Sequence, residues 1–164
     1  MKAERGGWRP MRREELRDEF VHDSYQSGKK LAEPSLCPEC GAVYRGGRWT
    51  WSGAPAKASK VLCPACHRIR DGFPAGHVTL RGEFFVAHRD EILQLVQNRA
   101  ARERAEHPLL RIIAIEPSPD GALITTTDIH LARNIGDALH SAYKGELEYH
   151  YNKQENLLRV AWRR

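Results

Sequence analysis

Two pairs of cysteines constrain the fold of this chain more than any other feature of its sequence. Cys37 and Cys40 are separated by two residues, and so are Cys63 and Cys66. Two thiolates at this spacing can hold one metal ion from a single tight turn, and two such turns complete a tetrahedron of four sulfurs. The doubled pattern therefore predicts one metal centre, and thiolate ligands in this geometry favour zinc or iron.

Zinc is the metal that we expect at this site, and a redox dithiol or an iron–sulfur centre is the alternative. Four thiolates fill the coordination shell of zinc, whereas a catalytic zinc keeps one position open for water. The predicted zinc is therefore structural. The glycine that follows the first pair, Gly41, permits the left-handed backbone step that such a turn needs. His67 directly follows Cys66, and we expect it to be a surface residue rather than part of the site.

The chain has a net charge of +5, and most of the positive excess lies in the segment that carries the cysteines. Residues 35–80 contain 6 basic and 2 acidic side chains, residues 1–34 contain 8 and 7, and residues 81–164 contain 12 of each. A local excess of cations favours an anionic partner such as nucleic acid.

The first residues, from Met1 to Arg17, are too charged for a signal peptide, and no apolar run approaches the roughly 18 residues of a membrane span. We therefore expect a cytoplasmic protein with no membrane partner. Because the cytoplasm is reducing, paired cysteines there are more often metal ligands than disulfides.

The composition divides the chain into three segments. Residues 1–34 are predicted to be a charged, flexible arm that orders on a partner, with a possible helix over Met11–His22; a tail without a role is the alternative. Residues 35–76 form the predicted zinc-binding module, which is too short and too poor in apolar residues to fold without a metal. Residues 77–164 have clear periodicity and form the predicted α+β domain.

The periodicity of residues 77–164 predicts the order β-α-β-β-α-β-β. The predicted strands cover His77–Val86, Leu109–Glu116, Ala122–Thr127, Leu147–Tyr151 and Leu158–Trp162, and the helices cover His88–Glu106 and the stretch after a cap at Thr127 or Asp128. The first six elements match a ferredoxin-like β-α-β-β-α-β domain, with two helices on one face of an antiparallel sheet. The seventh element would add a hairpin strand at the edge of that sheet.

The segment between the two cysteine pairs places arginines beside aromatic residues in a glycine-rich loop. Arginine binds phosphate and stacks on bases, and aromatic rings stack on unpaired bases. The predicted RNA-binding residues of the module are Arg45, Arg48, Trp49, Trp51, Lys57, Lys60, Arg68 and Arg70, and those of the arm are Arg12, Arg13, Lys29 and Lys30. Alternatively, Trp49 and Trp51 cover the cysteine site as a small core.

No motif of a known class of active site stands out. The sequence has no glycine-rich phosphate loop, no nucleophile elbow and no His-Glu motif of zinc proteases. Its eight histidines are scattered along the chain. Asp128 and His130 lie close together, but a helix cap explains Asp128 better than acid–base chemistry does. We therefore expect a binding protein rather than an enzyme.

Three motifs carry a resemblance to a known family. They are Leu36-Cys37-Pro38-Glu39-Cys40-Gly41, Val61-Leu62-Cys63-Pro64-Ala65-Cys66 and the run from Thr125 to Ala132, Thr-Thr-Thr-Asp-Ile-His-Leu-Ala. Over most of residues 30–164 the chain resembles a family of small bacterial zinc-knuckle proteins. That family is similar to the archaeal and eukaryotic nonsense-mediated-decay-named adaptor of the large ribosomal subunit. The adaptor carries more Cys-x-x-Cys knuckles than this chain, which has one set.

The resemblance implies that Cys37, Cys40, Cys63 and Cys66 bind zinc and that the protein binds ribosomal RNA of the large subunit, with a ribosomal protein as a second possible contact. A role in translation regulation, ribosome stability or ribosome hibernation would follow from such binding. The adaptor's role in export from the nucleus does not carry over to a bacterium, because a bacterium has no nucleus. A protein–protein adaptor with a structural zinc module is the alternative, and an enzyme with an unrecognised site is a third.

Overall fold

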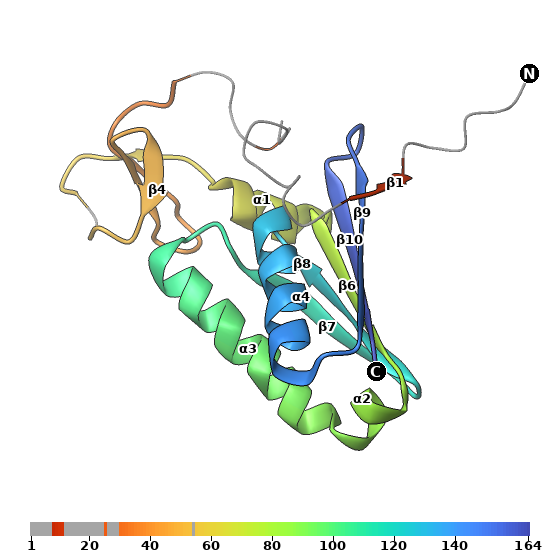
Figure 1. Ribbon diagram of the computed structural model, residues 1–164. Helices are drawn as coiled ribbons and strands as arrows, with labels where there is room; N and C mark the ends of the chain where they lie inside the picture. Colours follow the sequence, from red (N-terminus) through yellow and green to blue (C-terminus); the bar gives the residue numbers. More distant parts are fainter. Residues whose placement is uncertain (1–7, 12–24, 26–29, 54) are drawn as a thin grey trace, which may run out of the picture.

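The computed structural model describes residues 8–11, 25, 30–53 and 55–164 (Figure 1). Apart from Met11, the predicted helix over Met11–His22 lies outside these residues. The strands are β1 (Trp8–Pro10), β2 (Ser35–Leu36), β3 (Val43–Arg45), β4 (Arg48–Thr50), β5 (Ser59–Lys60), β6 (Gly76–Arg81), β7 (Ile112–Ser118), β8 (Gly121–Thr126), β9 (Glu146–Asn152) and β10 (Leu157–Arg163). The helices are α1 (Pro64–Asp71), α2 (Glu83–Ala87), α3 (Arg89–Glu106) and α4 (Ile129–Tyr143).

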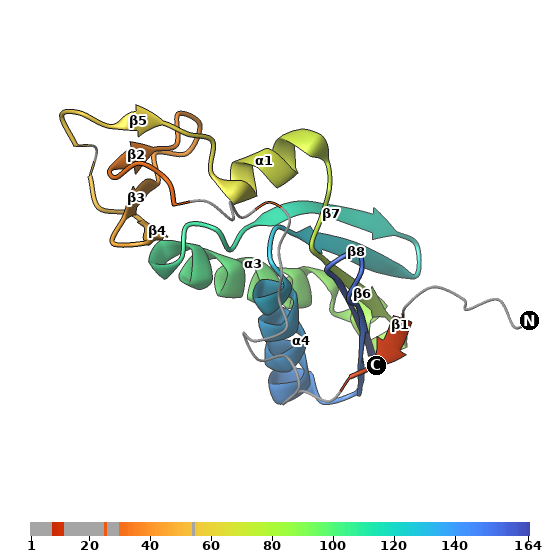
Figure 2. The same cartoon turned by 90° about the horizontal axis from the view of Figure 1, so that it is seen from above.

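The larger sheet has the strand order β1-β9-β10-β6-β8-β7. Helices α3 and α4 pack together on one of its faces, as Figures 1 and 2 show. Neighbouring strands are antiparallel except for β6 and β10, which are parallel. Helices and a mixed sheet confirm the α+β class that the periodicity predicts.

The position of the last strand differs from the ferredoxin-like prediction. That arrangement requires β9 beside β6 and β10 at the edge, but β10 lies between β9 and β6. The three inward side chains of β10, Leu158, Val160 and Trp162, are all buried. Alternation along a strand predicts which of its faces is buried, but it does not predict the neighbouring strand, because pairing depends on residues far away in the sequence.

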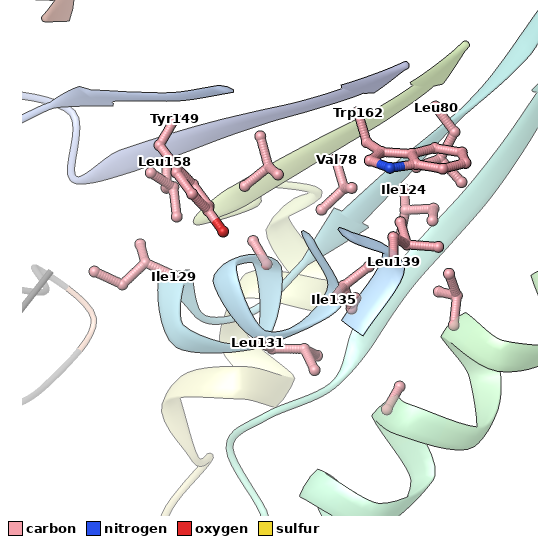
Figure 3. Close-up of a cluster of buried hydrophobic side chains, with 14 of the residues drawn as sticks. Val78, Leu80, Ile124, Ile129, Leu131, Ile135, Leu139, Tyr149, Leu158 and Trp162 are labelled. Carbon is pink, nitrogen blue, oxygen red and sulfur yellow. The ribbon is translucent and has the colours of Figure 1, made fainter. Parts of the chain in front are cut away.

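Helix α4 supplies much of the apolar core. Asp128 caps the helix by accepting a hydrogen bond from the backbone N–H of His130 at 2.7 Å, which decides between the two predicted caps. Leu131, Ile135 and Leu139 then recur on one face and are fully buried. Figure 3 shows Ile135 and Leu139 of this face near Ile124 of β8. Burial of each such side chain stabilises the fold by about 1.5–3 kcal/mol.

The predicted strand over His77–Val86 is shorter in the structure. Strand β6 ends at Arg81, and α2 begins at Glu83. Phe85 on α2 is fully buried in the core, so this segment turns back as a short helix instead of continuing the sheet. The helix predicted from His88 starts one residue later as α3 and buries Ile92 and Val96, as its periodicity predicts.

The start of the described chain joins the larger sheet. Strand β1 pairs antiparallel with β9, and the N–H of Met11 donates to the carbonyl of Tyr149 at 2.9 Å. Residues 8–11 of the predicted arm are therefore a sheet edge. None of the helices in the described ranges combines the length and the apolar character that crossing a bilayer requires.

Candidate metal centre

The four cysteines lie beside the smaller sheet, which has the order β4-β3-β2-β5: Cys37 and Cys40 in the loop from β2 to β3, and Cys63 and Cys66 at the start of α1. Their sulfur atoms all lie within 4.8 Å of one another, and the Sγ atoms of Cys40 and Cys63 are 3.7 Å apart. Four ligands at 2.3 Å in a tetrahedron would be about 3.8 Å apart, which is the geometry of a four-thiolate zinc site. None of the four cysteines, all of which the structure describes, forms a disulfide. The predicted convergence is confirmed, and the donor set fits a metal ion.

The first cysteine pair lies in a tight turn between β2 and β3. The N–H of Gly41 donates to the carbonyl of Cys37 at 3.0 Å, and the N–H of Cys37 donates to the carbonyl of Ala42 at 2.8 Å. Gly41 has a φ of 81°, which confirms the predicted left-handed step and favours a residue without a Cβ. This turn directs Cys37 and Cys40 toward the same point.

The second pair opens helix α1, which the sequence analysis did not predict. Cys63 is the N-cap, and its Sγ accepts a hydrogen bond from the N–H of Cys66 at 3.3 Å. Pro64 occupies the first helical position, and Gly72 ends the helix in the left-handed conformation. The proline after the cap and the glycine after the last turn are the sequence signal that could have revealed this helix.

The surroundings of the sulfurs affect their ionisation in different ways. Burial opposes ionisation of Cys37, but hydrogen bonds from backbone N–H groups outweigh it and lower its pKa to about 7. Burial raises the pKa values of Cys63 and Cys66. At Cys63 the charges of the neighbouring cysteines add to this shift, whereas at Cys66 the hydrogen bond from Arg111 opposes it. Four adjacent thiolates repel one another, so the arrangement needs a cation in its centre to hold them all ionised.

Arg111 is a residue of the cysteine site that the sequence pattern does not reveal. Its side chain is only 7% exposed, and its guanidinium donates to Sγ of Cys66 at 3.1 Å and to Sγ of Cys63 at 3.4 Å. A divalent ion with four thiolates carries a net charge of −2, and a buried guanidinium beside it offsets part of that charge. Arg111 precedes β7, so it joins the cysteine cluster to the α+β domain.

Thr127 holds the backbone of this arginine in place. The N–H of Arg111 donates to the Thr127 hydroxyl at 2.9 Å, and that hydroxyl lies 2.6 Å from the carbonyl of Leu109, to which it donates. Thr126 donates to the carbonyl of Asp128 at 2.8 Å. The threonine run therefore connects the end of β8, the cap of α4 and the loop that carries Arg111.

The predicted RNA-binding residues of the module have different environments. Those that are exposed are Arg45, Arg48, Lys57, Lys60 and Arg70, and Lys30 at the end of the arm is exposed as well. Arg70 forms an ion pair with Glu39. Arg68 is 1% exposed, donates to the carbonyl of Phe73 at 3.0 Å and lies over the ring of Tyr25, so burial removes it from any surface contact. Arg12, Arg13 and Lys29 lie outside the described residues.

The two tryptophans of the module also differ in their burial and in their contacts. Trp49 is half-buried and packs against the cysteine cluster, as the alternative of a small core predicts. Trp51 is 37% exposed, and its Nε1 donates to the carbonyl of Arg104 on α3 at 2.6 Å. Trp51 thus contacts the α+β domain and does not cover the cysteines. His67 is exposed, as predicted.

Comparison of the chain with known protein families, curated proteins and solved structures found no match. The resemblance on which the ribosomal reading rests therefore stays a prediction. The features of the molecule that bear on function are the cysteine cluster, its arginine partner and the exposed cations.

Proposed function

We propose that this protein is a cytoplasmic RNA-binding protein in which one structural zinc ion holds a cationic module against an α+β domain. The observation that carries this proposal is the exposed hairpin of β3 and β4. Arg45 and Arg48 face each other in its register and are both exposed, close to the half-buried Trp49. Guanidinium groups beside aromatic rings suit phosphates and unpaired bases.

Zinc is the metal that we propose for the cluster. Thiolates bind zinc and iron well, and the 3.7 Å separation of two sulfurs agrees with a closed tetrahedral zinc shell. A closed shell leaves no position for a substrate or a water nucleophile. We therefore propose a structural zinc and a binding function without catalysis.

The charge of the module is concentrated on its surface. Residues 35–60 contain four basic side chains, at positions 45, 48, 57 and 60, and one acidic side chain, Glu39. All four of these cations are exposed, whereas Glu39 is paired with Arg70 from outside this range. A surface of this kind attracts a polyanion and releases counterions from it on binding.

The proposed partner is ribosomal RNA of the large subunit. This part of the proposal rests on the resemblance of the three motifs to a family that is similar to a large-subunit adaptor. Binding there would make the protein a factor in translation regulation, ribosome stability or hibernation, with a ribosomal protein as a second possible contact.

Salt-dependent RNA binding tests the proposal directly. We expect the affinity of the zinc-loaded protein for a labelled single-stranded RNA to fall steeply between 50 and 200 mM salt, by roughly tenfold or more if several phosphates are contacted. The double variant Arg45→Ala/Arg48→Ala should bind several-fold more weakly and have a smaller salt slope. The matched control is Arg81→Ala/Arg163→Ala, which removes two exposed, paired arginines from the larger sheet.

Sedimentation of the native protein through a sucrose gradient tests the ribosomal part. We expect co-migration with the large subunit or with whole ribosomes, and loss of that co-migration after nuclease treatment. A protein that stays at the top of the gradient in growing and in starved cells would contradict it.

An RNA affinity that does not change with salt, or that is equal in both double variants, would contradict RNA binding through the hairpin.

A protein–protein adaptor is the second candidate function, and one feature of the larger sheet favours it. Among the described strands, β7 forms one edge of the sheet and pairs only with β8. A partner could add a strand along Ile112–Ser118, because backbone groups at a sheet edge can pair with another chain. Capture of a partner that resists nuclease and is lost when β7 is altered would support this candidate.

A further inference from the structure

A cavity of about 380 Å³ lies between the metal-binding module and the α+β domain. Tyr44, Arg48 and Trp49 line it from β3 and β4, and Val61 lines it from the stretch after β5. The α+β domain contributes the loop from His107 to Leu110 and Asp128, whose carboxylate also caps α4. We propose that this cavity binds one unpaired nucleobase of RNA, an inference that rests on the proposed function and gives it a defined contact site.

The size and walls of the cavity suit a flat ring. Ligand sites in proteins usually measure about 300–1,000 Å³ and are mostly apolar, with a few polar groups that fix orientation. The rings of Tyr44 and Trp49 are 5.5 Å apart and inclined at 59°, and both residues are half-buried. Both residues line the cavity, and stacking on aromatic rings is how proteins hold bases that are not paired.

The charge beside the cavity distinguishes RNA from an apolar protein side chain as the occupant. Arg48 lines the cavity and is exposed, and Arg45 is the residue paired with Arg48 across the hairpin. Phosphates on either side of an inserted base would therefore meet guanidinium groups. An aromatic side chain from a protein partner would use the apolar walls but would bring no anions for these arginines.

The metal centre and Arg111 hold the two walls of the cavity together. Pro64, which lines the cavity, directly follows Cys63, and Leu110, which also lines it, directly precedes Arg111. Because Arg111 donates to Cys63 and Cys66, the wall from the module and the wall from the domain are joined at a buried contact. A cavity that is formed before binding loses less conformational freedom when a ligand enters.

The experiment compares two labelled strands of equal length and charge, oligoadenylate and an abasic ribose-phosphate strand, with the zinc-loaded full chain. Stacking of one base is worth about 1–3 kcal/mol, so we expect oligoadenylate to bind about 5- to 150-fold more tightly. Val61→Trp, which fills the cavity, should abolish this preference. Tyr44→Leu, which removes one ring without changing the charge, should reduce it, and it provides a second test if Val61→Trp loses its metal.

Two matched controls separate the cavity from the rest of the surface. Val86→Trp makes the same change at a residue that is 46% exposed on α2, and it should keep the preference for bases. Arg48→Ala should weaken binding of oligoadenylate more than Arg45→Ala does, because only Arg48 lines the cavity. Zinc content, measured for each variant, shows that the module is intact.

Three outcomes would overturn the inference. Equal binding of both strands by the wild-type protein would show that the cavity takes no base, while the proposed RNA binding would stand. A preference that survives in both Val61→Trp and Tyr44→Leu would place base stacking elsewhere. Failure to bind either strand would instead remove the proposed function itself, together with the inference.

Discussion

The six-stranded sheet buries a large apolar core, whereas the core beside the four-stranded sheet is made mostly of cysteines. The first core contains some of the largest side chains of the fold, among them Trp162, Phe85 and Leu80, all of them fully buried. The second consists of Cys37, Cys63, Cys66 and two alanines, with Trp49 and Leu62 packed around it.

This difference predicts what keeps each part folded. Area removed from water stabilises the α+β domain by about 25 cal/mol per Å², and twenty buried residues supply that area. Two alanines and a few partly buried neighbours cannot offset the conformational entropy of some forty ordered residues. We therefore expect the small module to take its stability from a metal ion and from its contacts with the domain, through Arg111 and Trp51.

Loss of one cysteine should have the largest effect and should separate the two parts most clearly. In Cys63→Ser, the serine still caps helix α1, so the loss of a metal ligand is the main change. Structural zinc contributes about 10–16 kcal/mol of apparent binding energy, and that energy is coupled to folding. We expect zinc to be absent by elemental analysis, the module to unfold and the helical signal of the α+β domain to persist.

The control for this prediction is His67→Ser, which changes the exposed residue directly after Cys66 and should keep one zinc ion per chain. If Cys63→Ser retained both its metal and its fold, the four-cysteine centre would be wrong. If the whole chain unfolded, the two parts would not differ in the way that their cores suggest.

A cavity in the larger core should produce the opposite result. Leu131→Ala removes a fully buried side chain from α4 and should lower the free energy of unfolding by about 2–5 kcal/mol. We expect the zinc content to stay at one per chain at temperatures below the lowered midpoint. Denaturation followed by circular dichroism measures the loss, and Val86→Ala on the exposed side of α2 should change it by less than about 0.5 kcal/mol.

Removal of Arg111 should have an intermediate effect on both parts, because this side chain belongs to one and contacts the other. Arg111→Ala leaves Cys63 and Cys66 without a charged hydrogen-bond donor and should lower the free energy of unfolding by about 1–3 kcal/mol. Zinc should also transfer faster to a chelator. Arg111→Lys keeps the positive charge but lacks the planar guanidinium that donates to both sulfurs, so it should recover only part of the lost stability.

Arg102→Ala is the control for Arg111, because it removes an exposed arginine from α3 without touching the cysteines. Equal zinc-transfer rates in Arg111→Ala and the wild-type protein would mean that the guanidinium is not coupled to the metal centre. If zinc transfer were fast in Arg111→Ala but as slow in Arg111→Lys as in the wild-type protein, the effect would come from charge rather than from hydrogen bonds.

The parts of the fold that could be predicted from the sequence are those that depend on local spacing. The cysteine pairs converge because each pair occupies a single turn, and α3 and α4 follow from apolar residues at helical intervals. The hairpin of β7 and β8 follows from the turn signal Asp120-Gly121 between a β-rich run and its partner strand. In each case the residues that decide the structure lie within a few positions of one another.

The parts that could not be predicted depend on distant residues. The insertion of β10 beside β6 pairs Val160 with Val78, and nothing near either residue records that choice. Arg111 looks like any other arginine before a strand, and only the fold brings it to Cys66. Arg68 looked available for RNA, but Phe73 and Tyr25 enclose it. Charge alone predicts neither burial nor partners.

Acidification offers the smallest effect and tests the larger domain by itself. His77 lies on β6, where burial lowers its pKa below the ordinary value and the nearby Arg159 lowers it further, while Glu116 opposes this shift. The folded state therefore takes up a proton less readily than the unfolded state. The free energy of unfolding should be unaffected above about pH 6.5 and should fall as the pH decreases below it.

His77→Gln should remove this contribution to the pH dependence. The cysteine cluster is sensitive to acid for another reason, because thiolates release their metal when they are protonated, and the variant should leave that sensitivity unchanged. Urea denaturation of both proteins at pH 7.5 and 5.5, followed at the helical signal, measures the difference. We expect the wild-type domain to lose more stability on acidification than the variant does. An equal loss in both proteins would mean that the acid response originates in the metal centre, so that the two parts are not independent in the way that their cores imply.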